Sequence, residues 1–120
     1  MIDHLLHLSS AVAPSQVSIL LMLLFAHFVG DFTLQSAAMA RGKIPGGDPH
    51  IAWGWWLTAH VSTHAFLVLV ITGSFWIGLL EFVSHALLDW AKIRGIIGFN
   101  TDQILHLAFK FIWVFILIFS

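Results

Sequence analysis

The chain has 120 residues, of which 59% are hydrophobic and only 9% are charged, and its mean hydropathy is +0.94. Soluble domains of this size carry about 25% charged residues, so this composition excludes a water-soluble globular domain and indicates a lipid bilayer as the solvent. The net charge of −1 offers no basic surface for nucleic acid, and the absence of cysteine excludes disulfides and thiolate metal ligands.

The chain begins with an apolar segment, residues 1–15, that contains no Lys or Arg. We expect this segment to lie at the membrane interface. Secretory signal peptides start with basic residues and have an unbroken apolar centre, whereas His27 and Asp31 interrupt the apolar stretch that follows. The first hydrophobic segment is therefore expected to be retained, and residues 16–120 are expected to form a single transmembrane domain.

The rest of the chain divides into four predicted membrane spans. A crossing needs about 20 apolar residues, so the apolar stretch from Ile51 to about Ile93 is too long for one span and divides at Gly73. The last span opens with Asn100, whose distance from Gln103 along the chain is that of a capping box. The predicted spans are residues 16–39, 53–72, 75–92 and 101–119. The sequence thus predicts an all-α membrane protein, a four-helix transmembrane bundle with short loops.

Basic residues mark two of the three connections between these spans. Arg41 and Lys43 follow the first span, and Lys92 and Arg94 follow the third. Because cytoplasmic loops of membrane proteins carry an excess of Lys and Arg, we expect these two loops to face the cytoplasm. Both chain termini are then expected on the outer side of the membrane.

Polar residues recur at intervals of four within the spans. The stripes are His27, Asp31 and Gln35 in the first span, His60 and His64 in the second, Glu81, His85 and Asp89 in the third, and Asp102, His106 and Lys110 in the fourth. Residues four apart share one helix face, and polar faces inside a membrane turn toward the bundle interior. Since successive helices run in opposite directions, all four stripes are expected in the half of the membrane next to the basic loops.

Imidazole and carboxylate together indicate a metal site. They are the ligands of zinc, iron or manganese when no thiolate is available, and helical bundles build such sites from residues on facing helices. The predicted ligands of the divalent metal ion are His27, Asp31, His60, His64, His85, Asp89 and His106. The residues predicted to support these ligands are Gln35, Glu81, Gln103 and Lys92. A general base is expected from Asp31, Asp89 or Asp102.

Structural interpretations remain open for the same residues. The His and Asp pairs could be hydrogen-bonded contacts between helices, and His60 with His64 could be haem ligands. Asp102 lies in a first helical turn, where the helix dipole favours an acidic residue. Lys92, Arg94, Arg41 and Lys43 are interpreted as topology determinants, with a phosphate-bearing head group as a second interpretation. Gln35 and Lys110 could instead extend toward the interface.

Three runs of sequence resemble a known family. They are His27-Phe-Val-Gly-Asp31-Phe-Thr-Leu-Gln35, His85-Ala-Leu-Leu-Asp89 followed by Lys92, and Asp102-Gln103-Ile-Leu-His106. Together they are similar to the small bacterial membrane proteins catalogued as domain of unknown function 3307, over about residues 17–115. The resemblance implies a multi-pass protein of the bacterial inner membrane and no known reaction. A looser likeness is to bacterial inner-membrane proteins described as metal-dependent hydrolases, which also place His and Asp near helix ends.

Four functions are compatible with these features. The first is an intramembrane metal-dependent hydrolase that acts near the cytoplasmic face on a lipid-like or phosphoester substrate. The second is a small accessory subunit of a larger membrane complex or homo-oligomer, in which the stripes hold helices together. The third is a component of a cation or proton transporter, although the outer halves of the spans are nearly all apolar. The fourth is a haem-binding electron carrier, for which the neighbouring carboxylates are unnecessary.

Overall fold

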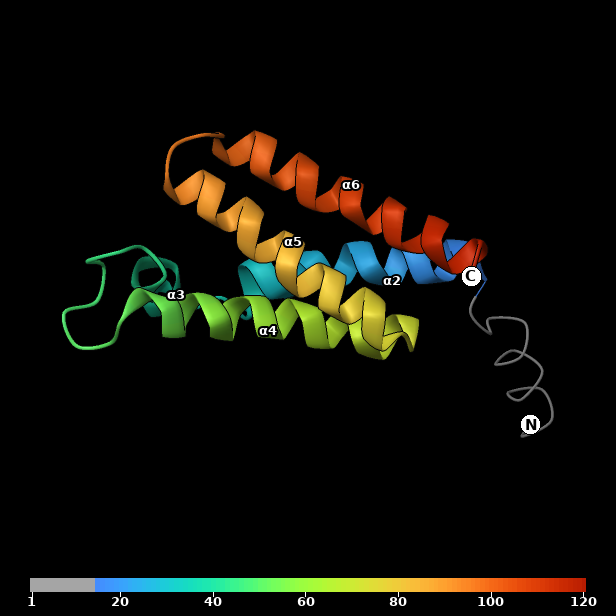
Figure 1. Cartoon of the computed structure of the whole chain (residues 1–120), viewed down its shortest axis with the longest axis horizontal. Helices are drawn as coiled ribbons and strands as arrows, with labels where there is room; N and C mark the ends of the chain where they lie inside the picture. Colours follow the sequence, from blue (N-terminus) through green and yellow to red (C-terminus); the bar gives the residue numbers. More distant parts are fainter. Residues whose placement is uncertain (1–14) are drawn as a thin grey trace.

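The computed structural model describes residues 15–120 and is all-helical over that range (Figure 1). The predicted interfacial segment lies outside the described residues, apart from Ser15. Five α-helices and one π-helical turn follow one another along the chain. They are α2 (Gln16–Phe28), η1 (Val29–Thr33), α3 (Ala37–Gly42), α4 (Trp53–Thr72), α5 (Phe75–Ile93) and α6 (Phe99–Ile118).

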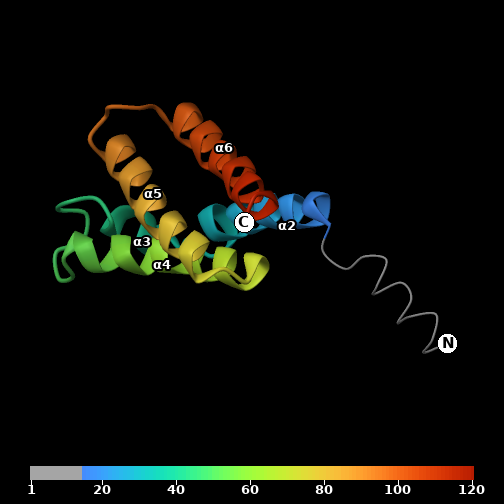
Figure 2. The same cartoon turned by 45° about the vertical axis from the view of Figure 1, so that its right-hand side comes forward.

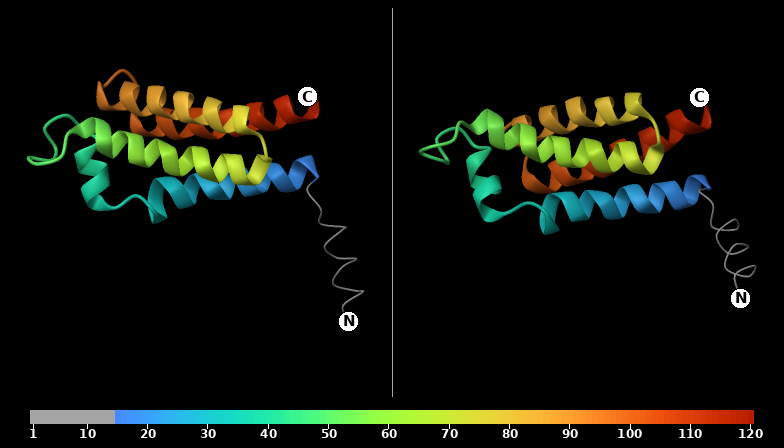
Figure 3. Two further views of the ribbon diagram at one scale, coloured as in Figure 1. Left: turned by 60° about the horizontal axis from the view of Figure 1, so that its bottom comes forward. Right: turned by 90° about the horizontal axis from the view of Figure 1, so that it is seen from below.

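Four long helical segments lie alongside one another. α4 and α5 form a hairpin, α2 packs against α4 and α6, and α5 packs against α6. The start of α2 and the end of α6 lie at one end of the molecule, and the loop after α3 and the α5–α6 connection lie at the opposite end (Figures 1 and 3). The short helix α3 lies beside the beginning of α4 (Figure 2).

The first long helix ends earlier than predicted. Residues 16–39 were expected to form one helix, but the helix ends at Thr33 in a π-helical turn. The N–H of Leu34 donates to the carbonyl of Val29 at 2.8 Å. Gln35 Nε2 donates to the carbonyl of Asp31 at 3.0 Å, and the Ser36 hydroxyl caps the separate helix α3. These side chains satisfy backbone groups that a longer helix would have paired, so the chain turns away before Met39.

The last helix starts without the predicted capping box. Its N-cap is Gly98, and no side chain caps its first turn. Gln103 lies inside the helix, and its amide bonds to side chains in the molecule's interior. The polar residue that was interpreted as a helix start signal is therefore used in long-range contacts.

Polar and apolar side chains are distributed as in a protein dissolved in lipid. Among the described residues, three segments are long and apolar enough to cross a membrane: Gln16–Thr33, Trp53–Thr72 and Phe99–Ile118. α5 has a similar length but carries Glu81, Asp89 and Lys92. Large apolar side chains such as Phe25 and Phe66 are more than 60% exposed, whereas most of the polar stripes are buried. Lipid solvates such an apolar surface, and most of the buried polar groups find partners inside.

An apolar core occupies the end of the molecule where α2 begins and α6 ends. Its buried members are Leu23, Val68, Ile77, Trp113 and Val114. These residues come from four different helices, so this end is held together by side-chain packing. The opposite half of the molecule contains the polar stripes.

Candidate metal centre

The interior of the polar half consists almost entirely of ionisable side chains. Each of them is between 0% and 7% exposed: His27, Asp31, Lys43, His60, His64, Glu81, His85, Asp89, Asp102, His106 and Lys110. They come from every described helical segment except α3, which Lys43 directly follows. Burial of so many polar groups is costly unless each one has a partner, so their mutual contacts define what the site can do.

Three imidazoles converge on one carboxylate oxygen. The Nε2 atoms of His60, His64 and His85 lie 3.2, 2.9 and 3.5 Å from Asp31 Oδ1. The Nε2 atoms of His60 and His85 are 3.3 Å apart. We call these four residues the three-histidine cluster, and their four ligand atoms all lie within 4.8 Å of one another. Two atoms that each bind a tetrahedral ion at about 2.0–2.1 Å are about 3.3–3.4 Å apart, which is close to the observed spacing.

Two atoms of this cluster are buried without a hydrogen-bond partner. They are His64 Nε2 and Asp31 Oδ1, which lie only 2.9 Å from each other. At this distance a correctly oriented N–H would form a good hydrogen bond, so the orientation of the ring, not the distance, prevents one. Both atoms are therefore available to a shared third partner. This donor set fits a divalent cation.

Glu81 fixes the protonation of His85. Its Oε1 atom lies 3.1 Å from His85 Nδ1, and it also accepts hydrogen bonds from Lys110 Nζ and, through Oε2, from Trp113 Nε1, each at 2.7 Å. A carboxylate accepts, so Nδ1 carries the proton of a neutral His85 and Nε2 presents its lone pair to the cluster. This carboxylate–histidine arrangement is the usual support of a metal-bound imidazole.

Gln103 plays a similar role for Asp31. Its Nε2 donates to Asp31 Oδ2 at 2.8 Å, which leaves Oδ1 of the same carboxylate to the cluster. The carboxylate of Asp31 can only accept, so the amide nitrogen of Gln103 must face it. The amide oxygen Oε1 then faces His27, at 2.9 Å from His27 Nε2. His27 Nε2 therefore donates to Gln103. The structure places His27 beside the site, connected to Asp31 through an amide.

A second group of ligand-type residues adjoins the first. His106 Nε2 lies 3.3 Å from Asp89 Oδ1 and 3.1 Å from Asp102 Oδ1. We call these three residues the two-aspartate cluster. The other oxygen of each acid faces a lysine: Lys43 Nζ donates to Asp89 Oδ2 at 2.9 Å, and Lys92 Nζ lies 3.4 Å from Asp102 Oδ2.

The charges of the two clusters differ. Within residues 15–120, Glu81 pairs with Lys110, Asp89 with Lys43 and Asp102 with Lys92. Asp31 has contacts with imidazoles and an amide but none with a lysine or arginine. The uncompensated negative charge of the interior therefore lies in the three-histidine cluster, which is where a cation would be most stabilised.

Two local features position these side chains. Gly30 lies directly against the His64 ring: a Cβ at residue 30 would be 2.5 Å from Cε1 and 2.6 Å from Nε2. Only glycine allows the π-helical turn and α4 to approach this closely. In the loop before α4, Asp48 accepts the backbone N–H groups of His50 and Ile51 and the indole N–H of Trp56, and these bonds lower the pKa of Asp48. This ordered loop follows directly after Lys43.

A comparison with protein families gives the chain its affiliation. Residues 19–120 match the family described as protein of unknown function (DUF3307). The chain belongs to this family. No match was found among curated proteins or among solved structures. Membership in the DUF3307 family carries no reaction with it, so the geometry of the site is the basis for a function.

Most of the site residues predicted from the sequence meet in one region. His60, His64, His85, Asp31, Asp89, Asp102 and His106 form the two clusters, and Glu81, Gln103 and Lys92 contact them directly. His27 reaches Asp31 mainly through Gln103, although His27 Nε2 is also 3.6 Å from Asp31 Oδ2. Gln35 donates to the backbone of Asp31 and contacts no clustered side chain, and its Oε1 is buried without a partner.

Sequence reasoning missed the roles of two residues. Lys43 was interpreted as a topology determinant, but it is 4% exposed and bonds to Asp89. Nothing in the sequence distinguishes it from the neighbouring, exposed Arg41. Trp113 did carry a signal, because it lies well inside a span while the other tryptophans lie near span ends. A tryptophan at that depth needs a partner for its N–H, and here the partner is Glu81.

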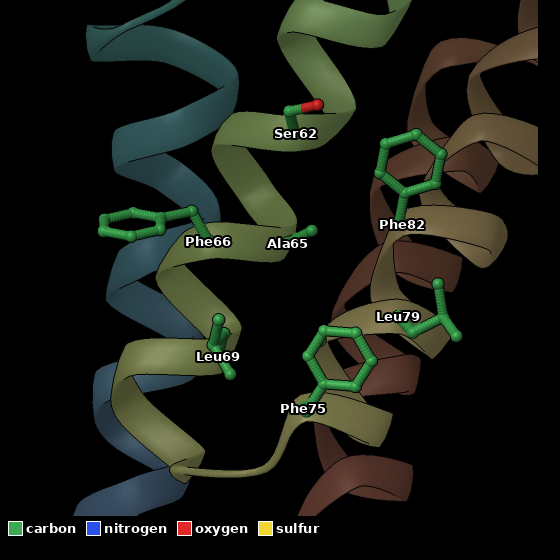
Figure 4. Close-up of a pocket in the computed structure, with 8 residues that line it drawn as sticks. Ser62, Ala65, Phe66, Leu69, Phe75, Leu79 and Phe82 are labelled. Carbon is green, nitrogen blue, oxygen red and sulfur yellow. The ribbon is translucent and has the colours of Figure 1, made fainter.

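An apolar groove lies away from both clusters. It has a volume of about 290 Å³ between α4 and α5, and none of its lining residues is a histidine or an acid (Figure 4). Its wall includes Phe66, Phe75 and Phe82, with Ala65 and Gly78 leaving the space between them. The groove therefore offers no ionisable group for chemistry.

Proposed function

We propose that this chain is a multi-pass protein of the bacterial inner membrane that binds one divalent metal ion and hydrolyses a lipid-like ester or phosphoester. The ion is held by the three-histidine cluster, and zinc, iron and manganese all suit a set of three imidazoles and one carboxylate. The observation that carries the proposal is the pair of buried, unbonded atoms His64 Nε2 and Asp31 Oδ1.

The membrane arrangement follows from the way α5 is packed. α5 contacts α4 and α6 along the molecule, and its three charged residues all have partners inside the protein. We therefore propose that α5 crosses the membrane with the other three helices as a four-helix bundle. Arg41 and Arg94 are exposed at the end of the bundle that holds the loops, which supports a cytoplasmic position for that end and an outer position for both termini.

Hydrolysis is the reaction that the neighbouring groups support. When bound, a divalent ion supplies Lewis acidity and makes water a better nucleophile at neutral pH. Asp31 was predicted as a base, but its contacts suit a ligand. Asp89 and Asp102 each hold the same imidazole, so we propose that they orient His106 as the proton carrier. His106 lies within 4.8 Å of a ligand atom of Asp31, close enough for one water molecule between them.

A second candidate is an accessory subunit of a larger membrane complex. It is favoured by the pairing of three buried acids with three lysines and by the exposure of only 0–1% at each clustered histidine. A structural network needs no access for a substrate. In that case the contacts of the polar half would act only as attachments between helices.

Elemental analysis of the purified protein separates these functions. We expect about one metal ion per chain in the wild type, and close to none in His64→Ala and Asp31→Asn. The matched control is His50→Ala, which removes an exposed loop histidine and should retain the ion. The metal-loaded wild type should cleave lipid phosphoesters in vesicles, and chelation should stop the cleavage. A metal-free wild type whose thermal stability is unchanged by chelators would instead support the accessory subunit.

A further inference from the structure

We infer that the two-aspartate cluster is a second cation site that the chain fills with its own Lys43 ammonium group, so that the protein binds one metal ion and not two. The inference rests on the proposed metal binding of the three-histidine cluster. It assigns Lys43, which follows α3, the role of a resident cation.

The residue types of the two-aspartate cluster are common ligands of divalent ions. Asp89 and Asp102 each turn one oxygen toward His106 Nε2, at 3.3 and 3.1 Å. His106 offers a ligand atom within 4.8 Å of His85 and Asp89 in one group and of Asp31 and Asp102 in another, so each acid shares such a group with a member of the three-histidine cluster. Two carboxylates and an imidazole form a common ligand set for manganese, iron or zinc.

A lysine contacts the remaining oxygen of each acid, and His60 Nε2 also lies 3.3 Å from that oxygen of Asp89. Lys43 Nζ lies 2.9 Å from Asp89 Oδ2, and the Lys43 side chain is only 5% exposed. Lys92 Nζ lies farther from Asp102 Oδ2, at 3.4 Å, and its side chain is 23% exposed. The shorter and more buried contact identifies Lys43 as the stronger competitor of a metal ion. An ammonium group and a divalent ion on the same carboxylate repel each other strongly in a medium of low dielectric constant.

Lys43 has a defined place in the structure. Gly42, the residue before it, lies against the indole ring of Trp56. The same indole donates its N–H to Asp48 at 2.9 Å, which ties the loop to α4. The backbone that carries Lys43 is therefore fixed on both sides, and its ammonium group is directed at Asp89 by tertiary contacts.

The three-histidine cluster has no such internal cation. Asp31 contacts four imidazole nitrogens, three of them through Oδ1, and the amide of Gln103, and no lysine reaches it in the described chain. Neutral imidazoles add no positive charge that would oppose a metal ion. The two clusters thus have similar ligand atoms but different charge: the three-histidine cluster keeps one uncompensated negative charge, whereas two lysines neutralise the two-aspartate cluster. This difference predicts that only the three-histidine cluster binds metal.

The test is the zinc stoichiometry of the protein in lipid nanodiscs, measured by equilibrium dialysis against Zn²⁺ and elemental analysis. We expect one Zn²⁺ per chain in the wild type and two in Lys43→Met, because methionine keeps the length of the side chain and removes its charge. Lys43→Arg, which keeps the charge, should bind one. The matched control is Arg41→Met, which removes an exposed positive charge two residues away and should also bind one.

His106→Ala gives an independent decision if Lys43→Met fails to fold. It removes the central ligand of the two-aspartate cluster and should leave the single Zn²⁺ of the wild type in place. Loss of that ion in His106→Ala, or a folded Lys43→Met with only one ion, overturns the inference. A wild type that binds two Zn²⁺ ions overturns this inference but leaves the proposed function standing. A wild type that binds no Zn²⁺ overturns the proposed function itself.

Discussion

The helices are held together by different kinds of contact in the two halves of this molecule. At one end, Leu23, Val68 and Ile77 pack in an apolar core. At the other end, imidazoles, carboxylates and ammonium groups from the same helices contact one another, and nearly all of them are less than 5% exposed. Trp113 joins the halves, because its ring belongs to the apolar core while its N–H donates to Glu81.

The difference matters because three of the helical segments are long and apolar enough to lie in lipid. Apolar side chains gain little by leaving lipid for a protein interior, so the apolar core contributes close packing and little selectivity among helix pairings. Unpartnered charges at membrane depth are costly, so the polar half favours arrangements in which the charged groups find partners. The polar half should therefore determine both the helix arrangement and the function.

The largest loss of stability is expected when one member of a buried charge pair in the polar half is removed. Lys110→Met leaves the carboxylate of Glu81 buried without its cation, and it should lower the free energy of unfolding by about 3–5 kcal/mol. The measurement is reversible unfolding in mixed micelles. The double variant Lys110→Met with Glu81→Leu removes both charges and should recover most of the lost stability. A single variant as stable as the wild type would show that Glu81 does not need Lys110.

A smaller change in the polar half should affect metal binding more than folding. Gly30→Ala places a methyl group against the His64 ring and should displace that imidazole, which lowers metal affinity by about 10–100-fold, as loss of a ligand's support does. Zinc titration of the purified protein measures the effect. The control is Gly54→Ala in α4, where an added Cβ meets no atom within 4 Å. Equal affinities for the two variants would separate His64 from the metal site.

The mildest effect is expected in the apolar core. Leu23→Ala should lower the free energy of unfolding by about 1–2 kcal/mol, below the range for soluble cores, because lipid dissolves the exposed leucine well. Its zinc stoichiometry should equal that of the wild type. Leu21→Ala, at a side chain that is 47% exposed, provides the matched control and should change neither quantity. Loss of zinc in Leu23→Ala would mean that the two halves are not independent.

Much of this arrangement could be predicted from the sequence. Spacing of four between His60 and His64, or between His85 and Asp89, requires a shared helix face, and the structure buries all four of these side chains. Other predictions failed where they depended on local signals alone. The helix expected to reach Met39 ends at Thr33, because side-chain bonds to the backbone terminate it.

The sequence by itself indicated a lipid environment, the number of long helices and the half of the molecule in which polar groups meet. These three features follow from composition, helical periodicity and alternating chain direction. Each of them can be read from single segments and from the order of the segments along the chain. Only the tertiary structure decided which atoms face each other: Asp31 toward three imidazoles, His27 toward Gln103, and Lys43 toward Asp89. The physical reason is that helix rotation and loop path depend on packing between segments far apart in the chain, and no local pattern records them.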